Sequence, residues 1–280
     1  MTELFNEGVG YSTLNTVRSS LSTIIKTENG TIGSHWLVSR FMKGISEIRP
    51  SIPRYSGTWD VNLILDYFDK LGINDDLSLE LLTKKVTVLL LILSGQRVQT
   101  PHLLKVNQIS FNKNDCVIRV TGSDQDKLKH FNAKKNVQVM TFEKYDDKKL
   151  CFVTCLQDYL KRTAGHRNSD YLLLCFKKPY GHASKDTISR WLKCVMKEVG
   201  IDTKVFGPHS VRGASTSAAA KLEVPLNTIL QAAGWSNAQT FKKFYFKDVH
   251  TCNQKNEKMN STKEFGNSIL KYFSERKKDI

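Results

Sequence analysis

Residues 86–97, VTVLLLILSGQR, decide how the rest of the chain is interpreted. The run is apolar from Val86 to Leu93 apart from Thr87, and it ends abruptly at Gly95-Gln96-Arg97. A membrane span takes about 18 apolar residues, so this shorter run predicts a helix buried inside a domain. With Ser78 as its N-cap, the helix would form the spine of that domain.

The segments that follow this spine change from strands back to helices. Three short stretches rich in β-branched and aromatic residues, 108–112, 116–121 and 137–142, predict a three-stranded antiparallel meander. Beyond it, helices are predicted at residues 154–163, 184–199, 209–221, 226–233 and 238–246. The helix at 184–199 has the clearest pattern, because its apolar residues recur every three or four positions until Gly200. The sequence therefore predicts a mainly α fold with a small antiparallel sheet (α+β).

The segment upstream of the spine predicts a separate small domain. Two helices are expected at residues 12–26 and 35–48. Pro50 and Pro53 exclude a helix and stiffen the backbone between them. Thr58 is the predicted N-cap of a helix at 59–71. We therefore expect four segments: a helical domain at 1–48, a linker at 49–55, the main domain at 56–250, and a polar tail at 251–280 with a last helix near 263–273.

The positive charge of the chain is concentrated in one part of it. Residues 1–100 contain as many Lys and Arg as Asp and Glu, so the whole net charge of +15 lies within residues 101–280. Clustered cations favour polyanions, because phosphates neutralised by Lys and Arg release their condensed counterions. From charge alone, a basic protein without a nucleic-acid partner remains an equal alternative.

Several other functions receive no support from the sequence. The six cysteines have no C-x-x-C spacing, which predicts reduced thiols rather than a zinc site or a disulfide framework. The acidic N-terminus lacks the basic and apolar segments of a secretory signal. We also find no carboxylate cluster that would hold Mg²⁺. We expect an intracellular protein without metal, cofactor or membrane partner.

Four short strings carry candidate chemistry, namely SGQR (94–97), PHSVR (208–212), AGWS (233–236) and FKKFY (241–245). Each is weak by itself; the spacing of His209 and Arg212 on one helical face, for instance, occurs often by chance. Their order is more specific. An arginine follows the buried helix, a small sheet and His-x-x-Arg come next, and Gly-Trp and then a tyrosine complete the series.

These strings resemble the tyrosine recombinases, the family of phage integrases, Xer-type resolvases and Cre-like enzymes. Four longer segments are most similar to the corresponding segments in recombinases of eukaryotic DIRS-like and Crypton-like mobile elements. These segments are SGQRVQT, DTISRWLK, HSVRGAS and GWSNAQTFKKFY. The resemblance covers residues 54–250. It implies a mainly helical catalytic domain whose site residues are Arg97, His209, Arg212, Trp235 and the nucleophile Tyr245.

The resemblance also implies a catalytic lysine on the hairpin between the second and third predicted strands. Lys127, Lys129, Lys134 and Lys135 all lie in that hairpin. The string LKHF, residues 128–131, best matches the lysine motif of the mobile-element branch, so Lys129 is the preferred candidate. A solvated or phosphate-contacting side chain is the alternative for each of the four.

The chemistry of strand cleavage accounts for these residue types. Arg97 and Arg212 present planar forks that can bind the non-bridging phosphate oxygens, where charge gathers in the transition state. The same cations favour the phenolate of Tyr245, whose ordinary pKa near 10 makes it a poor nucleophile at neutral pH. A lysine can protonate the leaving 5′-oxygen. Structural roles remain open for His209 at a helix start and for Trp235 and Tyr245 as packing residues.

Three departures from the family pattern bear on activity. Thr100 stands where many relatives carry an acidic residue, and the gap of ten between Trp235 and Tyr245 is one longer than in Xer- and Cre-like enzymes. The segment before the linker has room for two helices where about four are expected of a DNA-binding domain, and its charges nearly cancel. We expect this part of the DNA grip to be weak.

The resulting expectation is a DNA recombinase or integrase of a transposable element. It would act through a 3′-phosphotyrosyl intermediate, as a homotetramer on double-stranded DNA, in the nucleus. A catalytically inactive DNA-binding protein derived from such an element is the alternative. Relaxation of supercoiled DNA by a monomer, as type IB topoisomerases perform it, is a third and weaker one.

Overall fold

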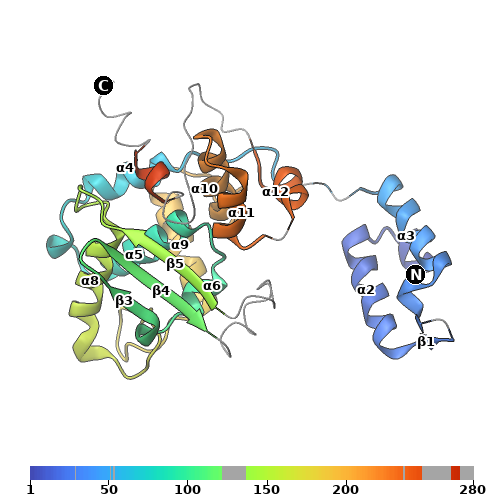
Figure 1. Ribbon diagram of the computed structural model, residues 1–280, viewed down its shortest axis with the longest axis horizontal. Coiled ribbons are helices and arrows are strands. Elements are labelled where there is room, and N and C mark those ends of the chain that lie inside the picture. Colours follow the sequence, from blue (N-terminus) through green and yellow to red (C-terminus); the bar gives the residue numbers. More distant parts are fainter. Residues whose placement is uncertain are drawn as a thin grey trace. The chain divides into compact units, whose positions relative to one another are not determined.

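The chain folds into two compact units, Met1–Arg54 and Tyr55–Ile280. The computed structural model describes residues 1–28, 30–50, 52, 54–121, 137–235, 237–247 and 266–271 (Figure 1). The division falls inside residues 49–55. None of the described helices is long and apolar enough to cross a membrane.

The first unit is built around two helices. These are α2 (Tyr11–Ile24) and α3 (Trp36–Ile48), and the short α1 (Thr2–Asn6) precedes them. The connection between the two main helices contains the strands β1 (Lys26–Thr27) and β2 (Gly30–Thr31) and the 3₁₀ helix η1 (Ile32–Ser34). Its buried apolar core consists of Leu14, Met42 and Ile45.

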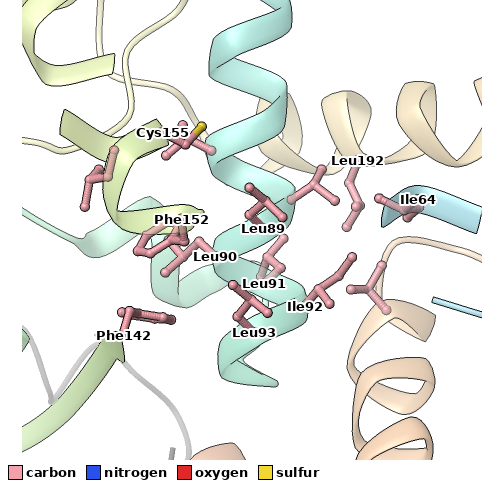
Figure 2. Packing of buried hydrophobic residues seen from close by; sticks show 14 of the residues in the cluster. Ile64, Leu89, Leu90, Leu91, Ile92, Leu93, Phe142, Phe152, Cys155 and Leu192 are labelled. Atoms are coloured by element: carbon pink, nitrogen blue, oxygen red, sulfur yellow. The ribbon is translucent and has the colours of Figure 1, made fainter. Parts of the chain in front are cut away.

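The spine of the second unit is the buried helix α5 (Leu79–Ser94). The Ser78 hydroxyl caps it by accepting a hydrogen bond from the Leu81 amide at 3.2 Å, as predicted. Gly95 ends it in the left-handed conformation at φ 61°. Figure 2 shows the run Leu89–Leu93 surrounded by Ile64, Phe142, Phe152, Cys155 and Leu192, which come from different elements of the unit. The predicted buried spine is thus confirmed.

A three-stranded antiparallel sheet lies beside this spine (Figure 1). Its strands, in spatial order, are β3 (Ile109–Phe111), β4 (Asp115–Thr121) and β5 (Val137–Glu143). Residue Cys116 of β4 pairs with Phe111 and Phe142, so consecutive strands are neighbours. One face of the sheet is buried through Cys116, Ile118 and Val120. The predicted meander and the predicted fold class are confirmed.

The prediction that Thr58 caps the next helix is wrong. Helix α4 (Asn62–Lys70) starts four residues after Thr58, which is itself buried. The carboxylate of Asp60 instead accepts a hydrogen bond from the Asn62 amide at 3.0 Å. An aspartate that bonds the backbone two residues ahead forms a local turn, and this turn sets a later start for the helix.

Further helices complete the second unit. They are α6 (Gln99–Leu103), α8 (Phe152–Thr163), α9 (Lys185–Glu198), α10 (Ser210–Lys221), α11 (Leu226–Ala233) and α12 (Ala238–Phe244), with the 3₁₀ helices η2 (Asn74–Asp76), η3 (Val106–Gln108) and η4 (Ala164–His166). The helices predicted between residues 154 and 246 are all present. Helix α6 was not predicted, because it is short and contains Pro101, although proline is tolerated in a first turn.

Part of the polar tail packs on the second unit of its own chain. Residues 266–271 are helical, and Ile269 and Leu270 are buried in the main core. The Tyr145 hydroxyl donates to the Leu270 carbonyl at 3.1 Å. A Cβ on Gly266 would lie 3.4 Å from the Leu93 carbonyl oxygen, so the segment closely approaches the end of α5.

Candidate active site

Arg212 is the most buried of the predicted site residues. It lies in the first turn of α10, and only 3% of its surface is exposed. Its Nη1 atom donates to the Gly95 carbonyl at 2.9 Å. This bond joins α10 to the connection that follows α5, and Arg97 lies in that connection two residues later. The spine therefore ends where the two arginines approach one another.

The rings of Trp235 and Tyr245 lie beside the Arg212 guanidinium. Gly234 ends α11 in the left-handed conformation at φ 68°, so the chain turns sharply just before Trp235. The Arg212 Cζ atom lies 4.0 Å from the Trp235 ring centroid and 5.7 Å from that of Tyr245. The two rings are 4.5 Å apart. A guanidinium this close to an indole face makes a favourable cation–π contact and is held in one orientation.

Three hydrogen-bond donors in this cluster are buried and unused. Nε and Nη2 of Arg212 and Nε1 of Trp235 have no hydrogen-bond partner in the described part of the chain. Leaving a buried polar group unpaired costs about 1–3 kcal/mol, more for a charged one, so native proteins rarely do so without a functional reason. Donors fixed by packing and left unpaired are well suited to bind an anion.

The electrostatics of the cluster also favour an anion. Burial lowers the pKa of Arg212, the nearby Arg97 guanidinium lowers it further, and Tyr245 acts in the opposite direction. Neither arginine forms a salt bridge with an acidic residue in the described ranges. Two guanidiniums that interact electrostatically, neither of them in a salt bridge within the described ranges, favour a phosphate-sized anion.

Tyr245 lies just beyond the end of α12 and is half-buried. Its amide donates to the Phe241 carbonyl at 2.9 Å, and its own carbonyl accepts from the Ser217 hydroxyl at 2.6 Å. Its ring lies against α10, since a Cβ on Gly213 would be 3.9 Å from the Tyr245 Cδ1 atom. The phenol is thus adjacent to both Trp235 and Arg212 instead of packing with the neighbouring phenylalanines alone.

His209 lies at the start of α10, beside the cluster in sequence. His209 is exposed and immediately precedes α10, one turn before Arg212, and its side chain does not cap the helix. Lys129 lies outside the described residues, and so do the other three candidate lysines of the hairpin. The structure therefore brings Arg212, Trp235 and Tyr245 into contact, with Arg97 near enough to Arg212 to interact with it electrostatically. His209 is the N-cap residue of the helix that contains Arg212.

Three supporting hydrogen bonds were missed at the level of sequence. Gln96 is buried and its amide donates to the Ala232 carbonyl, while the Thr100 hydroxyl donates to the Gln96 side-chain oxygen at 3.2 Å. The Trp59 indole donates to the Ser210 hydroxyl at 2.8 Å, which holds the start of α10. Gln96 stands inside the SGQR string, but nothing in its spacing indicates a partner so distant in the chain.

No cluster of His, Cys, Asp or Glu side chains suited to a metal ion occurs among the residues that the structure describes. The side chains in contact at the candidate site are the cationic Arg212 and the aromatic Trp235 and Tyr245.

Comparison with known proteins identifies the family. Residues 60–250 match the model of the phage integrase family, and the chain belongs to that family of tyrosine recombinases. No curated protein sequence matches the chain significantly.

Solved structures share the fold at low sequence identity. The XerH site-specific recombinase bound to palindromic difH substrate, in a post-cleavage complex, is 14% identical with a TM-score of 0.56, over 85% of this chain and 64% of that one. The Tn1549 transposon integrase in complex with transposon right end DNA is 13% identical with a TM-score of 0.54, over 90% and 79%. A lambda integrase dimer bound to a COC′ core site is 13% identical with a TM-score of 0.51, over 91% and 80%. This chain thus spans less than two thirds of the XerH chain.

Proposed function

We propose that this protein is a site-specific DNA recombinase or integrase that cuts and rejoins strands through Tyr245. One observation carries the proposal: the buried Arg212 guanidinium, which lies against the Trp235 ring, has two unpaired nitrogens beside a tyrosine. Membership of the phage integrase family supports the same chemistry.

In the proposed reaction the Tyr245 oxygen attacks a backbone phosphorus of DNA. The bond between phosphorus and the 5′-oxygen breaks, which leaves a 3′-phosphotyrosyl bond and a free 5′-hydroxyl. Arg97, Arg212 and the Trp235 indole would bind the non-bridging oxygens, with His209 as a further donor. Lys129 would supply the proton that the leaving oxygen takes up. A 5′-hydroxyl from a partner strand reverses these steps and reseals the DNA.

The partners follow from this chemistry. Double-stranded DNA is the proposed substrate, supported by the excess positive charge of residues 101–280. Exchange between two duplexes requires four cuts, so we infer a homotetramer on DNA. The resemblance of the GWSNAQTFKKFY string to DIRS-like and Crypton-like recombinases supports an origin in a transposable element and action in the nucleus. Residues 1–48 would form the partial DNA-binding domain and residues 56–250 the catalytic domain.

The test is covalent capture on DNA. A pool of nicked suicide duplexes of varied sequence is incubated with wild type, Tyr245→Phe or Tyr180→Phe, and denaturation-resistant protein–DNA adducts are collected and sequenced. Wild type and Tyr180→Phe should give the same adducts, because Tyr180 stacks on His166 outside the cluster. Tyr245→Phe should give none. No adduct with wild type, combined with salt-dependent DNA binding, would instead support an inactive DNA-binding protein.

A further inference from the structure

A single serine holds the main chain of Tyr245 on the helix that carries Arg212. Ser217 lies in α10 and is fully buried. Its hydroxyl donates to the Tyr245 carbonyl at 2.6 Å and accepts from the Lys247 amide at 3.1 Å. Both partners lie about 30 residues away along the chain. One hydroxyl therefore joins two backbone groups at and just after Tyr245 to α10.

The two preceding residues show that this bond is not a consequence of helical geometry. Ser215 and Thr216 are also buried, but their hydroxyls donate to the Arg212 carbonyl within the same helix, at 3.3 and 2.7 Å. Such bonds to a carbonyl one turn earlier are common for hydroxyl residues inside helices. Ser217 instead bonds to another segment, so its hydroxyl has a tertiary role that those of its neighbours lack.

The segment at Tyr245 needs such support because α12 is short. The helix ends at Phe244, and the amides of Tyr245 and Phe246 both donate to the Phe241 carbonyl. A helix of seven residues is only marginally stable by itself. The carbonyl of Tyr245 and the amide of Lys247 have Ser217 as their hydrogen-bond partner. Loss of that hydroxyl would leave both backbone groups unpaired at the point where the nucleophile is attached.

The geometry points to Ser217 as a positioning residue for the nucleophile, an inference that rests on the proposed function. Through α10, Ser217 fixes the distance between the Tyr245 main chain and the Arg212 fork of the same subunit. Without this bond the main chain at Tyr245 would be less fixed, and the phenol would spend less time in line with a phosphate bound by Arg212. Attack depends steeply on such alignment, since a displacement of about 1 Å can cost on the order of 100-fold in rate.

A first experiment measures the bond without DNA. Hydrogen exchange of the Lys247 amide is followed in wild type, Ser217→Ala and Ser215→Ala, with exchange in α5 as an internal reference for global stability. Ser217→Ala should speed exchange at Lys247 on the order of tenfold, as expected for the loss of one hydrogen bond. Ser215→Ala should leave it unchanged. Equal exchange at Lys247 in all three proteins would overturn the inference, whatever the protein does to DNA.

A second experiment measures the consequence for cleavage. On a suicide duplex, the rate of adduct formation at saturating DNA should fall about 10- to 100-fold in Ser217→Ala, while the half-saturating DNA concentration stays the same. Ser217→Thr, which keeps a hydroxyl, should recover part of the rate, and Ser215→Ala should resemble wild type. Normal rates in Ser217→Ala would overturn the positioning role alone. Absence of adduct in wild type as well would instead count against the proposed function, and the exchange data would still decide whether the bond exists.

Discussion

Trp235 contributes two properties to the site that a substitution can separate. Its ring lies against the Arg212 guanidinium, and its indole N–H is a buried donor without a described partner. Trp235→Phe keeps an aromatic ring but removes the donor. We expect adduct formation on a suicide duplex to slow on the order of 100-fold, the usual cost of one preorganised donor. The free energy of unfolding should fall by only about 1–2 kcal/mol.

Trp191 provides a matched control for this substitution. It lies in α9, is buried and packs on Phe176 with ring centroids 5.4 Å apart. Trp191→Phe should lower the free energy of unfolding to a similar extent and leave the adduct rate near that of wild type. A similar loss of rate in both variants would mean that Trp235 acts through stability and not through its indole N–H.

Lys85 gives the protein a pH-dependent stability that is independent of the site. It is fully buried in α5, and its ammonium donates to the Asn74 side-chain oxygen at 2.9 Å. Burial lowers the pKa of Lys85 below its ordinary value of 10.5. The unfolded chain therefore holds this proton more tightly than the folded chain does. Stability from this group is least below the folded pKa and rises as the pH approaches 10.5.

The measurement compares wild type with Lys85→Met by urea unfolding at several pH values from 7 to 10. Burial raises the pKa of the Cys116 and Cys155 thiols to about 12, so these groups destabilise the fold above about pH 9. Both proteins contain these thiols, so the difference between them isolates Lys85. The stability of Lys85→Met relative to wild type should decrease as the pH rises. A difference that does not change with pH would contradict the prediction.

At the scale of elements, Gln96 connects the end of α5 to the end of α11. Its amide bonds the Ala232 carbonyl, and Thr100 donates to its oxygen. Arg97 follows Gln96 directly, and Trp235 lies three residues after Ala232. The hydrogen bonds of Gln96 therefore form a brace that fixes the segment carrying Arg97 relative to the segment carrying Trp235. Gln96→Leu should lower the free energy of unfolding by about 1–3 kcal/mol, because buried groups lose their partners. It should also slow adduct formation.

A double-mutant cycle with Thr100→Val tests this brace. Thr100→Val removes the donor to Gln96, so the double variant should be less destabilised than the sum of the two single variants. Gln157→Leu, at an exposed position of α8, is the control and should be nearly neutral. Additive effects of Gln96→Leu and Thr100→Val would show that the two side chains act independently.

The elements differ in how far the sequence predicts them, and the reasons are physical. Helices α5 and α9 are predictable because each combines an apolar pattern with a serine cap, Ser78 or Ser184, that acts locally. Helix α6 and the start of α4 are not predictable in this way. Pro101 argues against a helix that is in fact formed, and Asp60 forms a turn that competes with the cap expected at Thr58. Local rules work where one residue decides and fail where two local signals compete.

The same distinction applies to the candidate site. The motif strings name Arg97, Arg212, Trp235 and Tyr245, and the structure brings the last three into contact, with Arg97 near enough to Arg212 to interact with it electrostatically. The strings do not predict that Trp235 stacks on Arg212 or that Ser217 holds Tyr245. Those contacts depend on how α10, α11 and α12 pack, which is a tertiary property. Lys129 stays a prediction, because it lies outside the described residues.

At the scale of the whole molecule, the two units have very different cores. The second unit buries apolar residues from α4, α5, the sheet and α8 to α10 in one continuous cluster. The first buries only Leu14, Met42 and Ile45 among its described residues, and Trp36 is 64% exposed. A small unit buries a small share of its apolar surface and is correspondingly marginal. We therefore expect the first unit to open at a much lower free energy than the second.

A pair of buried methionines tests this difference in the full chain by hydrogen exchange. Met42→Ala removes a side chain from the small core, at a cost of about 2–5 kcal/mol that is comparable to the whole stability of such a unit. Exchange in α2 and α3 should then approach that of an unfolded chain, while α5 keeps its protection. Met196→Ala, in the buried face of α9, should speed exchange in α5 and leave α2 and α3 unchanged. If Met42→Ala accelerated hydrogen exchange in α5 as much as in α2, the two units would unfold together. The small core could then not be considered independent.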